Sequence, residues 1–102
     1  MTKISELVKY WQKTAEKDYQ VMLGLYRLKH YSYCLFFGHI ILEKILKALV
    51  VKNTNEHAPK IHDLVRLQDL AGLNLEYKKV ILLKEINEFN LLSRYPDYKL
   101  SF

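Results

Sequence analysis

The sequence predicts a single all-α domain over residues 1–102, folded as an antiparallel up-and-down bundle of four main helices. The chain has 102 residues, which allows one compact domain, and half of them are hydrophobic, which excludes a disordered chain. Three glycines are too few for the turns of an all-β sandwich. Apolar residues recur at steps of three, four or seven, which is helical spacing.

Composition also limits the compartment and the chemistry. Cys34 is the single cysteine, so no internal disulfide can form, and the charged N-terminal segment lacks the apolar core of a signal peptide. A cytoplasmic location is therefore expected. The longest nearly uncharged run, residues 31–42, is too short to span a bilayer. A net charge of +5 permits contact with phosphates but does not require it.

The first predicted helix runs from Thr2 or Ser5 to Lys29. Its apolar stripe consists of Ile4, Val8, Trp11, Ala15, Met22 and Leu25. Asp18 falls on this stripe, where a carboxylate needs an ionic or hydrogen-bonding partner. It either has a structural partner in the core or lines a cleft.

The second predicted helix, residues 31–52, is apolar almost all round and must be covered on most sides. Self-association is one way to cover it, so a homodimer is expected. Glu43 and Lys47 have the i, i+4 spacing of an ion pair. Alternatively, with Lys44 they line a polar groove at a dimer interface. Gly38 is expected to allow close packing.

A polar, proline-containing loop is predicted over residues 53–61. Asp63 is expected to cap a short third helix over residues 64–71, which Gly72 closes in a left-handed conformation. His62 is expected to help Asp63 to fix the start of this helix.

Asn74 is expected to cap the fourth helix, and Pro96 to stop it. The predicted core face of this helix consists of Leu75, Ile81, Leu82, Ile86, Phe89 and Leu92. The four helices with their short connections define the predicted bundle.

No metal and no cofactor are expected. His57 and His62 lack the i, i+4 helical spacing of paired zinc ligands. No cysteine or carboxylate is expected at ligand spacing from His30 or His39.

The segment from Ser93 to Lys99 combines one arginine with two tyrosines. Arg94 sits at the end of the predicted fourth helix, where the helix dipole favours a cation. With Tyr95 and Tyr98 it forms either a C-terminal cap with aromatic packing, or an arginine fork for phosphate with tyrosines that stack on a base. The segment alone does not separate these interpretations.

Several segments together resemble the HEPN family (higher eukaryotes and prokaryotes nucleotide-binding domain). They occur in family order and cover nearly the whole chain: Trp11, Ala15 and Asp18; Tyr31-Ser32-Tyr33; Leu42-Glu43-Lys44-Ile45-Leu46-Lys47-Ala48-Leu49; His62-Asp63-Leu64 with Leu67; and Ser93-Arg94-Tyr95-Pro96. The resemblance implies a helical bundle that dimerises with a cleft between protomers. It also implies a minimal nucleotidyltransferase as partner, in a two-component toxin–antitoxin system.

Many members of the family are metal-independent ribonucleases with a histidine four to six residues after the arginine. A histidine there would take the proton of a ribose 2′-hydroxyl while the arginine stabilises the phosphorane. The corresponding positions here are Tyr98, Lys99 and Leu100. This departure argues against efficient RNA cleavage.

The leading prediction is a dimeric module that binds RNA or the phosphate of a nucleotide, with Arg94 on the phosphate, and that acts with a minimal nucleotidyltransferase. The other residues expected at the site are Tyr95, Tyr98, Lys44 and Lys47 as contacts, and Asp18, Glu43, His62 and Asp63 as supporting groups. A second hypothesis is a metal-independent ribonuclease toxin in which Tyr98 or His62 replaces the base. A third is a purely structural helical interaction domain.

Overall fold

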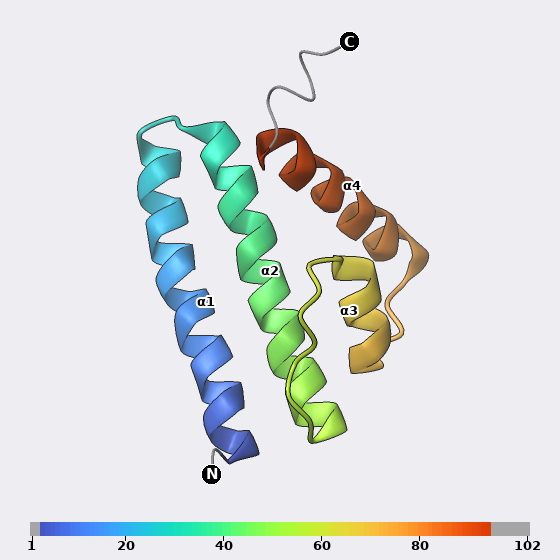
Figure 1. Ribbon diagram of the computed structural model, residues 1–102. Helices are drawn as coiled ribbons and strands as arrows, with labels where there is room; N and C mark the ends of the chain where they lie inside the picture. The colour runs from blue at the N-terminus through green and yellow to red at the C-terminus, as the bar shows by residue number, and fades with distance from the viewer. Residues whose placement is uncertain (1–2, 95–102) are drawn as a thin grey trace.

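The computed structural model describes residues 3–94, with side chains for residues 3–88. Four helices follow one another: α1 (Ile4–Arg27), α2 (Tyr31–Thr54), α3 (Leu64–Ala71) and α4 (Tyr77–Arg94). Helices α1 and α2 form an antiparallel hairpin, and α3 and α4 lie on the other side of α2 (Figure 1). No strand occurs in the described part, so the predicted all-α helical bundle is confirmed.

Helix α2 is the centre of the molecule, because it packs against each of the other three helices. This position explains why its sequence is apolar almost all round. Buried residues of α2, α3 and α4 form the main core cluster: Leu46, Val50, Leu64, Leu67, Ala71 and Leu83. The chain itself therefore provides most of the cover that α2 needs, although Leu35 and Ile45 remain 45% and 42% exposed.

Helix α3 begins and ends as predicted. The Asp63 carboxylate accepts hydrogen bonds from the backbone N–H groups of Val65 and Arg66, at 3.0 and 3.4 Å, and so satisfies two free donors of the first turn. Gly72 follows the last turn with φ 71°, a left-handed conformation that glycine adopts without a Cβ clash.

The prediction that Asn74 caps α4 is wrong. Asn74 has φ 53°, whereas an N-cap residue has an extended backbone. The helix begins at Tyr77, and the Glu76 carbonyl accepts its first hydrogen bonds. Asparagine tolerates left-handed angles in turns, so Asn74 belongs to the α3–α4 connection.

The predicted core face of α4 is also wrong at one position. Leu82 is 53% exposed, whereas the next residue, Leu83, is 7% exposed and belongs to the core cluster. The two positions lie about 100° apart around the helix axis, so only one of them faces the core. Ile86 packs against the core cluster as predicted. The side chains of Phe89 and Leu92 lie outside the described set, and Pro96 lies outside the described residues.

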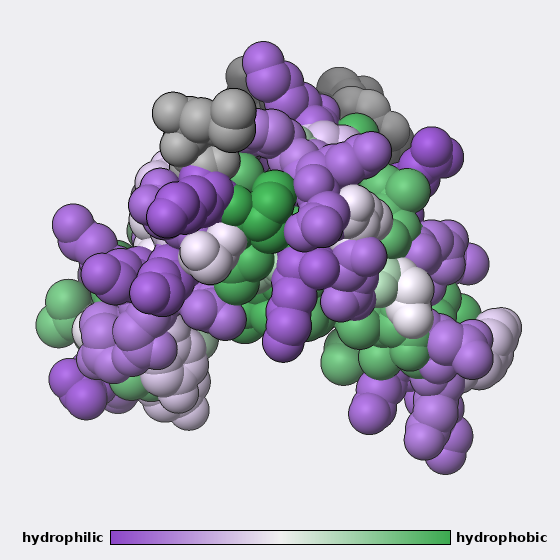
Figure 2. Space-filling view, turned by 90° about the horizontal axis from the view of Figure 1, so that it is seen from below, coloured by the Kyte–Doolittle hydropathy of each residue, from purple (hydrophilic) through white to green (hydrophobic). Residues whose placement is uncertain are grey.

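A shallow apolar groove runs between α1 and α2. One hollow of about 320 Å³ and another of about 130 Å³ share Gln12 and Ile45 in their linings. Viewed from the end of the bundle where α1 begins, hydrophobic surface lies between hydrophilic rims (Figure 2). The close packing expected at Gly38 is not found among the described residues, since none of them from outside the helix's own backbone comes within 4 Å of a Cβ built there. None of the described helices combines the length and the hydropathy that a membrane crossing requires.

Candidate functional site

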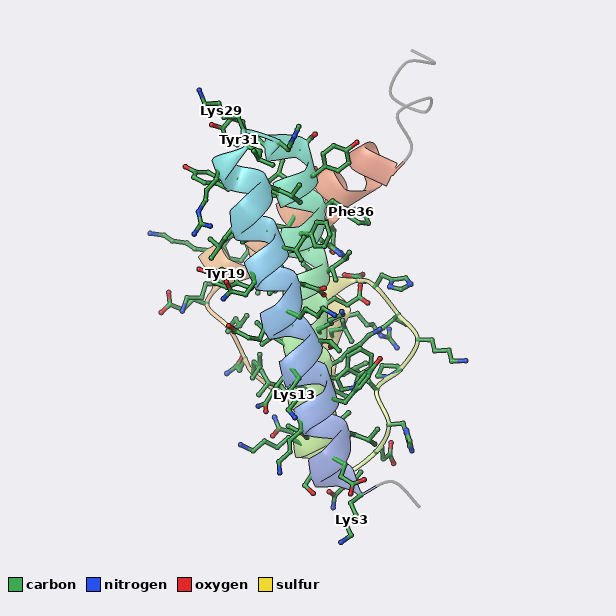
Figure 3. The ribbon with its side chains drawn as sticks, turned by 90° about the vertical axis from the view of Figure 1, so that its left-hand side faces the viewer. Lys3, Lys13, Tyr19, Lys29, Tyr31 and Phe36 are labelled. Carbon is green, nitrogen blue, oxygen red and sulfur yellow. The ribbon has the colours of Figure 1, made fainter. Side chains whose placement is uncertain are left out.

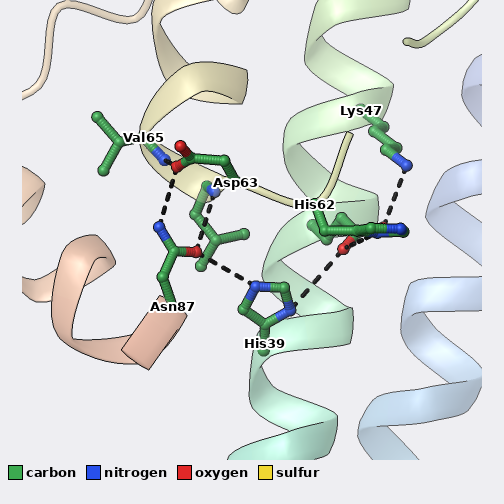
Figure 4. Close-up of polar contacts among 8 residues, drawn as sticks. His39, Lys47, His62, Asp63, Val65 and Asn87 are labelled. Atoms are coloured by element: carbon green, nitrogen blue, oxygen red, sulfur yellow. Dashed lines mark hydrogen bonds and ion pairs between the residues drawn. The ribbon is translucent and has the colours of Figure 1, made fainter. Parts of the chain in front are cut away.

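The candidate site is a polar network where α2, α3 and α4 meet (Figure 4). Asn87 is the residue of α4 that takes part in this network. The Asn87 side chain accepts a hydrogen bond from the Leu64 N–H at 3.1 Å and donates one to the Asp63 carboxylate at 3.0 Å. These two bonds tie α4 to the first turn of α3, and they fix which end of the amide is oxygen.

His39 connects this amide to α2. The ring is 3% exposed, and its Nε2 lies 3.3 Å from Asn87 Oδ1. Because that oxygen can only accept, Nε2 of His39 must carry the proton and donate. The other ring nitrogen, Nδ1, lies 3.8 Å from the Glu43 carboxylate, beyond hydrogen-bond distance.

Glu43 is the centre of the second half of the network. It accepts a hydrogen bond from the Lys47 ammonium at 3.1 Å, which confirms the ion pair expected from the i, i+4 spacing. Its two oxygens each lie 3.0 Å from Nδ1 of His62, which is 62% exposed. His62 therefore ties the loop before α3 to α2. The expectation that no cysteine or carboxylate stands at ligand spacing from His30 or His39 is wrong, since Cys34 and Glu43 each stand four residues later.

The ammonium group of Lys47 is held between Glu43 and an aromatic ring. Its side chain is 7% exposed, and Nζ lies 5.4 Å from the centre of the Trp11 ring on α1. This is cation–π geometry. The buried Lys47 thus joins α1 to the polar network.

Asp18 has the partner that its place on the apolar stripe requires. Its carboxylate accepts a direct hydrogen bond from the Lys44 ammonium, and the two side chains are 20% and 23% exposed. Together with Glu43–Lys47, this pair matches two of the three lysines of α2 with carboxylates. The two pairs therefore add no net positive charge to this face.

Arg94, the arginine expected on phosphate, lies at the end of α4. Arg94 is the last residue of α4, seven residues after Asn87, which is about 10 Å along the helix axis. Its side chain lies outside the described set, and Tyr95 and Tyr98 lie outside the described residues. Among the residues the structure describes, no group of three or more His, Cys, Asp or Glu side chains is placed to hold a metal ion.

Sequence reasoning missed His39 and Asn87 as members of the network. A signal for His39 exists, because Glu43 lies one turn further along the same helix face. Asn87 offers no such signal, since it meets His39 across 48 residues of sequence.

One of the comparisons with known proteins identifies a family. The family model for the HEPN domain matches residues 8–101, which includes the cation–π tryptophan, both ion pairs and the capped start of α3. No match was found among curated proteins or among solved structures. Since the match spans nearly the whole chain, the protein belongs to the HEPN family.

Proposed function

We propose that the protein binds RNA or the phosphate of a nucleotide, with Arg94 as the phosphate contact. The observation that carries this proposal is the HEPN match over residues 8–101, which includes the arginine at the end of α4. A guanidinium offers two parallel N–H donors to phosphate oxygens, and the carboxyl end of a helix favours a cation. The net charge of +5 attracts a polyanion.

The lysines of α2 play different parts in this proposal. Lys44 is 23% exposed, so a phosphate could compete with Asp18 for it. Lys47 is 7% exposed, and it supports the site by holding Glu43 and Trp11 together.

The test compares Arg94→Ala with Arg66→Ala, a control that removes the same charge from an exposed position on α3. Affinity for a labelled RNA is measured over a series of salt concentrations. Loss of a phosphate contact reduces the slope of log affinity against log salt by about 1. If both variants behave alike, Arg94 is not in the site.

We also propose that two copies associate through the α1–α2 groove. Apolar residues of both helices, Ala15 on α1 and Ile41 and Ile45 on α2, line the groove together with Gln12 and Glu16, and Ile45 is 42% exposed. Sedimentation of Ile45→Lys is compared with Leu70→Lys, a control on α3 with 41% exposure. The groove variant is expected to shift the protein to monomer. A wild-type protein that is monomeric at micromolar concentration rules the dimer out.

The partner that fits the family resemblance is a minimal nucleotidyltransferase in a toxin–antitoxin-type system. A short reading frame of that class beside the gene is the expected observation. Co-expression should then yield a complex of the two chains. Separate elution of the two chains in size-exclusion chromatography counts against this partner. The cytoplasmic location of the protein stays a prediction.

One observation favours a second candidate, a metal-independent ribonuclease. Glu43 orients Nδ1 of the exposed His62, as the acidic member of a catalytic triad orients its histidine, which leaves Nε2 as a base facing solvent. RNA is incubated with the protein and a chelator, and His62→Ala is compared with His57→Ala, an exposed histidine of the same loop. Cleavage that only His62→Ala removes supports this activity, and no cleavage at high protein concentration dismisses it.

A further inference from the structure

Exposed aromatic side chains gather at the turn between α1 and α2. Tyr26, Tyr31 and Tyr33 are 61%, 53% and 60% exposed. The Tyr26 and Tyr31 rings meet edge to face at 5.6 Å, and His30 meets Tyr33 at 6.1 Å. One exposed tyrosine is ordinary, but three within eight residues form a patch that the core does not explain. We call these four residues the tyrosine turn.

The tyrosine turn lies in a part of the hairpin that carries cations and no carboxylates. Arg27 and Lys29 lie between Tyr26 and His30 in the sequence, and both are exposed. No Asp or Glu occurs in the sequence between Asp18 and Glu43. In the part of the chain that the structure describes, no ion pair involves Arg27 or Lys29. The local charge is therefore positive and complementary to a polyanion.

The backbone of the turn is fixed rather than open. The His30 N–H donates to the Leu25 carbonyl at 2.9 Å and the Lys29 N–H to the Tyr26 carbonyl at 3.0 Å, which is a Schellman closure. Lys29 has φ 64° at the position that glycine usually occupies in this motif. A cation thus stands here at a conformational cost that glycine would avoid.

The carboxyl end of α4 reaches the same end of the bundle (Figure 1). From the contact between His39 and Asn87, Tyr33 lies six residues back along α2 and Arg94 seven residues forward along α4. At a rise of about 1.5 Å per residue, Tyr33 on α2 and Arg94 on α4 therefore lie about 9 and 10 Å beyond that contact, both toward the same end of the bundle. Figure 3 shows Lys29 and Tyr31 at the tip of the hairpin, at the opposite end from Lys3.

We infer that the tyrosine turn binds the unpaired bases of a single-stranded nucleic acid. The tyrosine rings stack on bases, while Arg27 and Lys29 contact the neighbouring phosphates. A duplex buries the base faces that the rings need, so it binds through its phosphates alone. This inference rests on the proposed function, because it adds a base-binding surface beside the phosphate contact assigned to Arg94.

The test measures fluorescence anisotropy with a labelled single-stranded RNA of about 12 nucleotides and with its blunt duplex, a length near the site size of single-strand binders. Tyr31→Ala and Tyr33→Ala are each expected to weaken single-strand binding about 5- to 100-fold, the loss of one stacked base. Duplex binding should stay unchanged. Tyr31→Phe and Tyr33→Phe keep the ring and should bind like wild type, as should the control Tyr77→Ala, whose side chain is 78% exposed on α4.

The outcomes separate this inference from the proposed function. Unchanged single-strand affinity in both alanine variants overturns the tyrosine turn, while Arg94→Ala tests the phosphate contact independently. Equal losses for single strand and duplex also overturn it, because stacking cannot then be the cause. If the alanine variants alter only sedimentation, the patch is a protein contact and the inference fails. If the wild type binds no nucleic acid or nucleotide, both proposals fall.

Discussion

The substitution Glu43→Gln tests whether the buried ammonium of Lys47 depends on this carboxylate. The side chains of Glu43 and Lys47 are 13% and 7% exposed, whereas those of Asp18 and Lys44 are 20% and 23% exposed. Removing one partner of a fully buried pair costs about 3–5 kcal/mol, and an exposed pair contributes about 1 kcal/mol or less. The Trp11 ring still faces Lys47 in the variant. We therefore expect a loss of about 2–3 kcal/mol for Glu43→Gln and of about 1 kcal/mol for Asp18→Asn.

Urea unfolding followed by far-ultraviolet circular dichroism measures these losses. With an m-value of about 1.5 kcal/mol/M, the midpoint should fall by about 1.3–2 M for Glu43→Gln and by less than about 1 M for Asp18→Asn. The double variant Glu43→Gln with Lys47→Met removes the stranded charge, so it should be more stable than Glu43→Gln alone. Equal midpoints for the two single variants, or a double variant no better than Glu43→Gln, would refute the reasoning.

Three further predictions concern the fold and are checked by thermal unfolding. Asp63→Ala removes the acceptor of two backbone donors and of the Asn87 amide, and should cost about 1–2 kcal/mol; a cost near zero would show that water replaces the cap. Leu67→Ala empties a fully buried position and should cost about 2–5 kcal/mol, against less than about 1 kcal/mol for Leu70→Ala, which is 41% exposed. Gly72→Ala places a Cβ on a residue with φ 71° and should cost about 1 kcal/mol. Gly24→Ala lies inside α1, where no described residue outside the helix backbone comes within 4 Å of the new Cβ, and should stabilise the protein by about 0.5–1 kcal/mol. Equal signs for the two glycine variants would contradict this account.

Local chemistry was sufficient to predict α3 from the sequence. The Asp63 side chain bonds to N–H groups two and three residues later, and Gly72 adopts a conformation that few other residues favour. Both signals depend on neighbouring residues alone. The helical periodicity of α1 and α2 is also local, and their predicted ranges differ from the observed ones by a few residues at most.

The start of α4 and the polar network depend on tertiary contacts, which the sequence does not reveal. Asn74 suits an N-cap and a left-handed turn equally well, so the residue type alone does not place the start of α4. His39 and Asn87 meet across 48 residues, and nothing local distinguishes Asn87 from any exposed asparagine. The burial of Lys47 likewise requires Trp11 from another helix.

The arrangement of the core has a consequence for how the molecule opens. The main core cluster draws on α2, α3 and α4, and in the described part of the chain α1 packs against α2 alone. Detaching α1 would therefore break only the α1–α2 contact and leave that cluster intact. The amide hydrogens of α1 should then exchange with solvent well before those around Leu64 and Leu67. A ligand that bridges α1 and α2 near their turn would slow exchange along the whole of α1. Hydrogen–deuterium exchange across residues 4–27 would thus report occupancy without any label on the ligand.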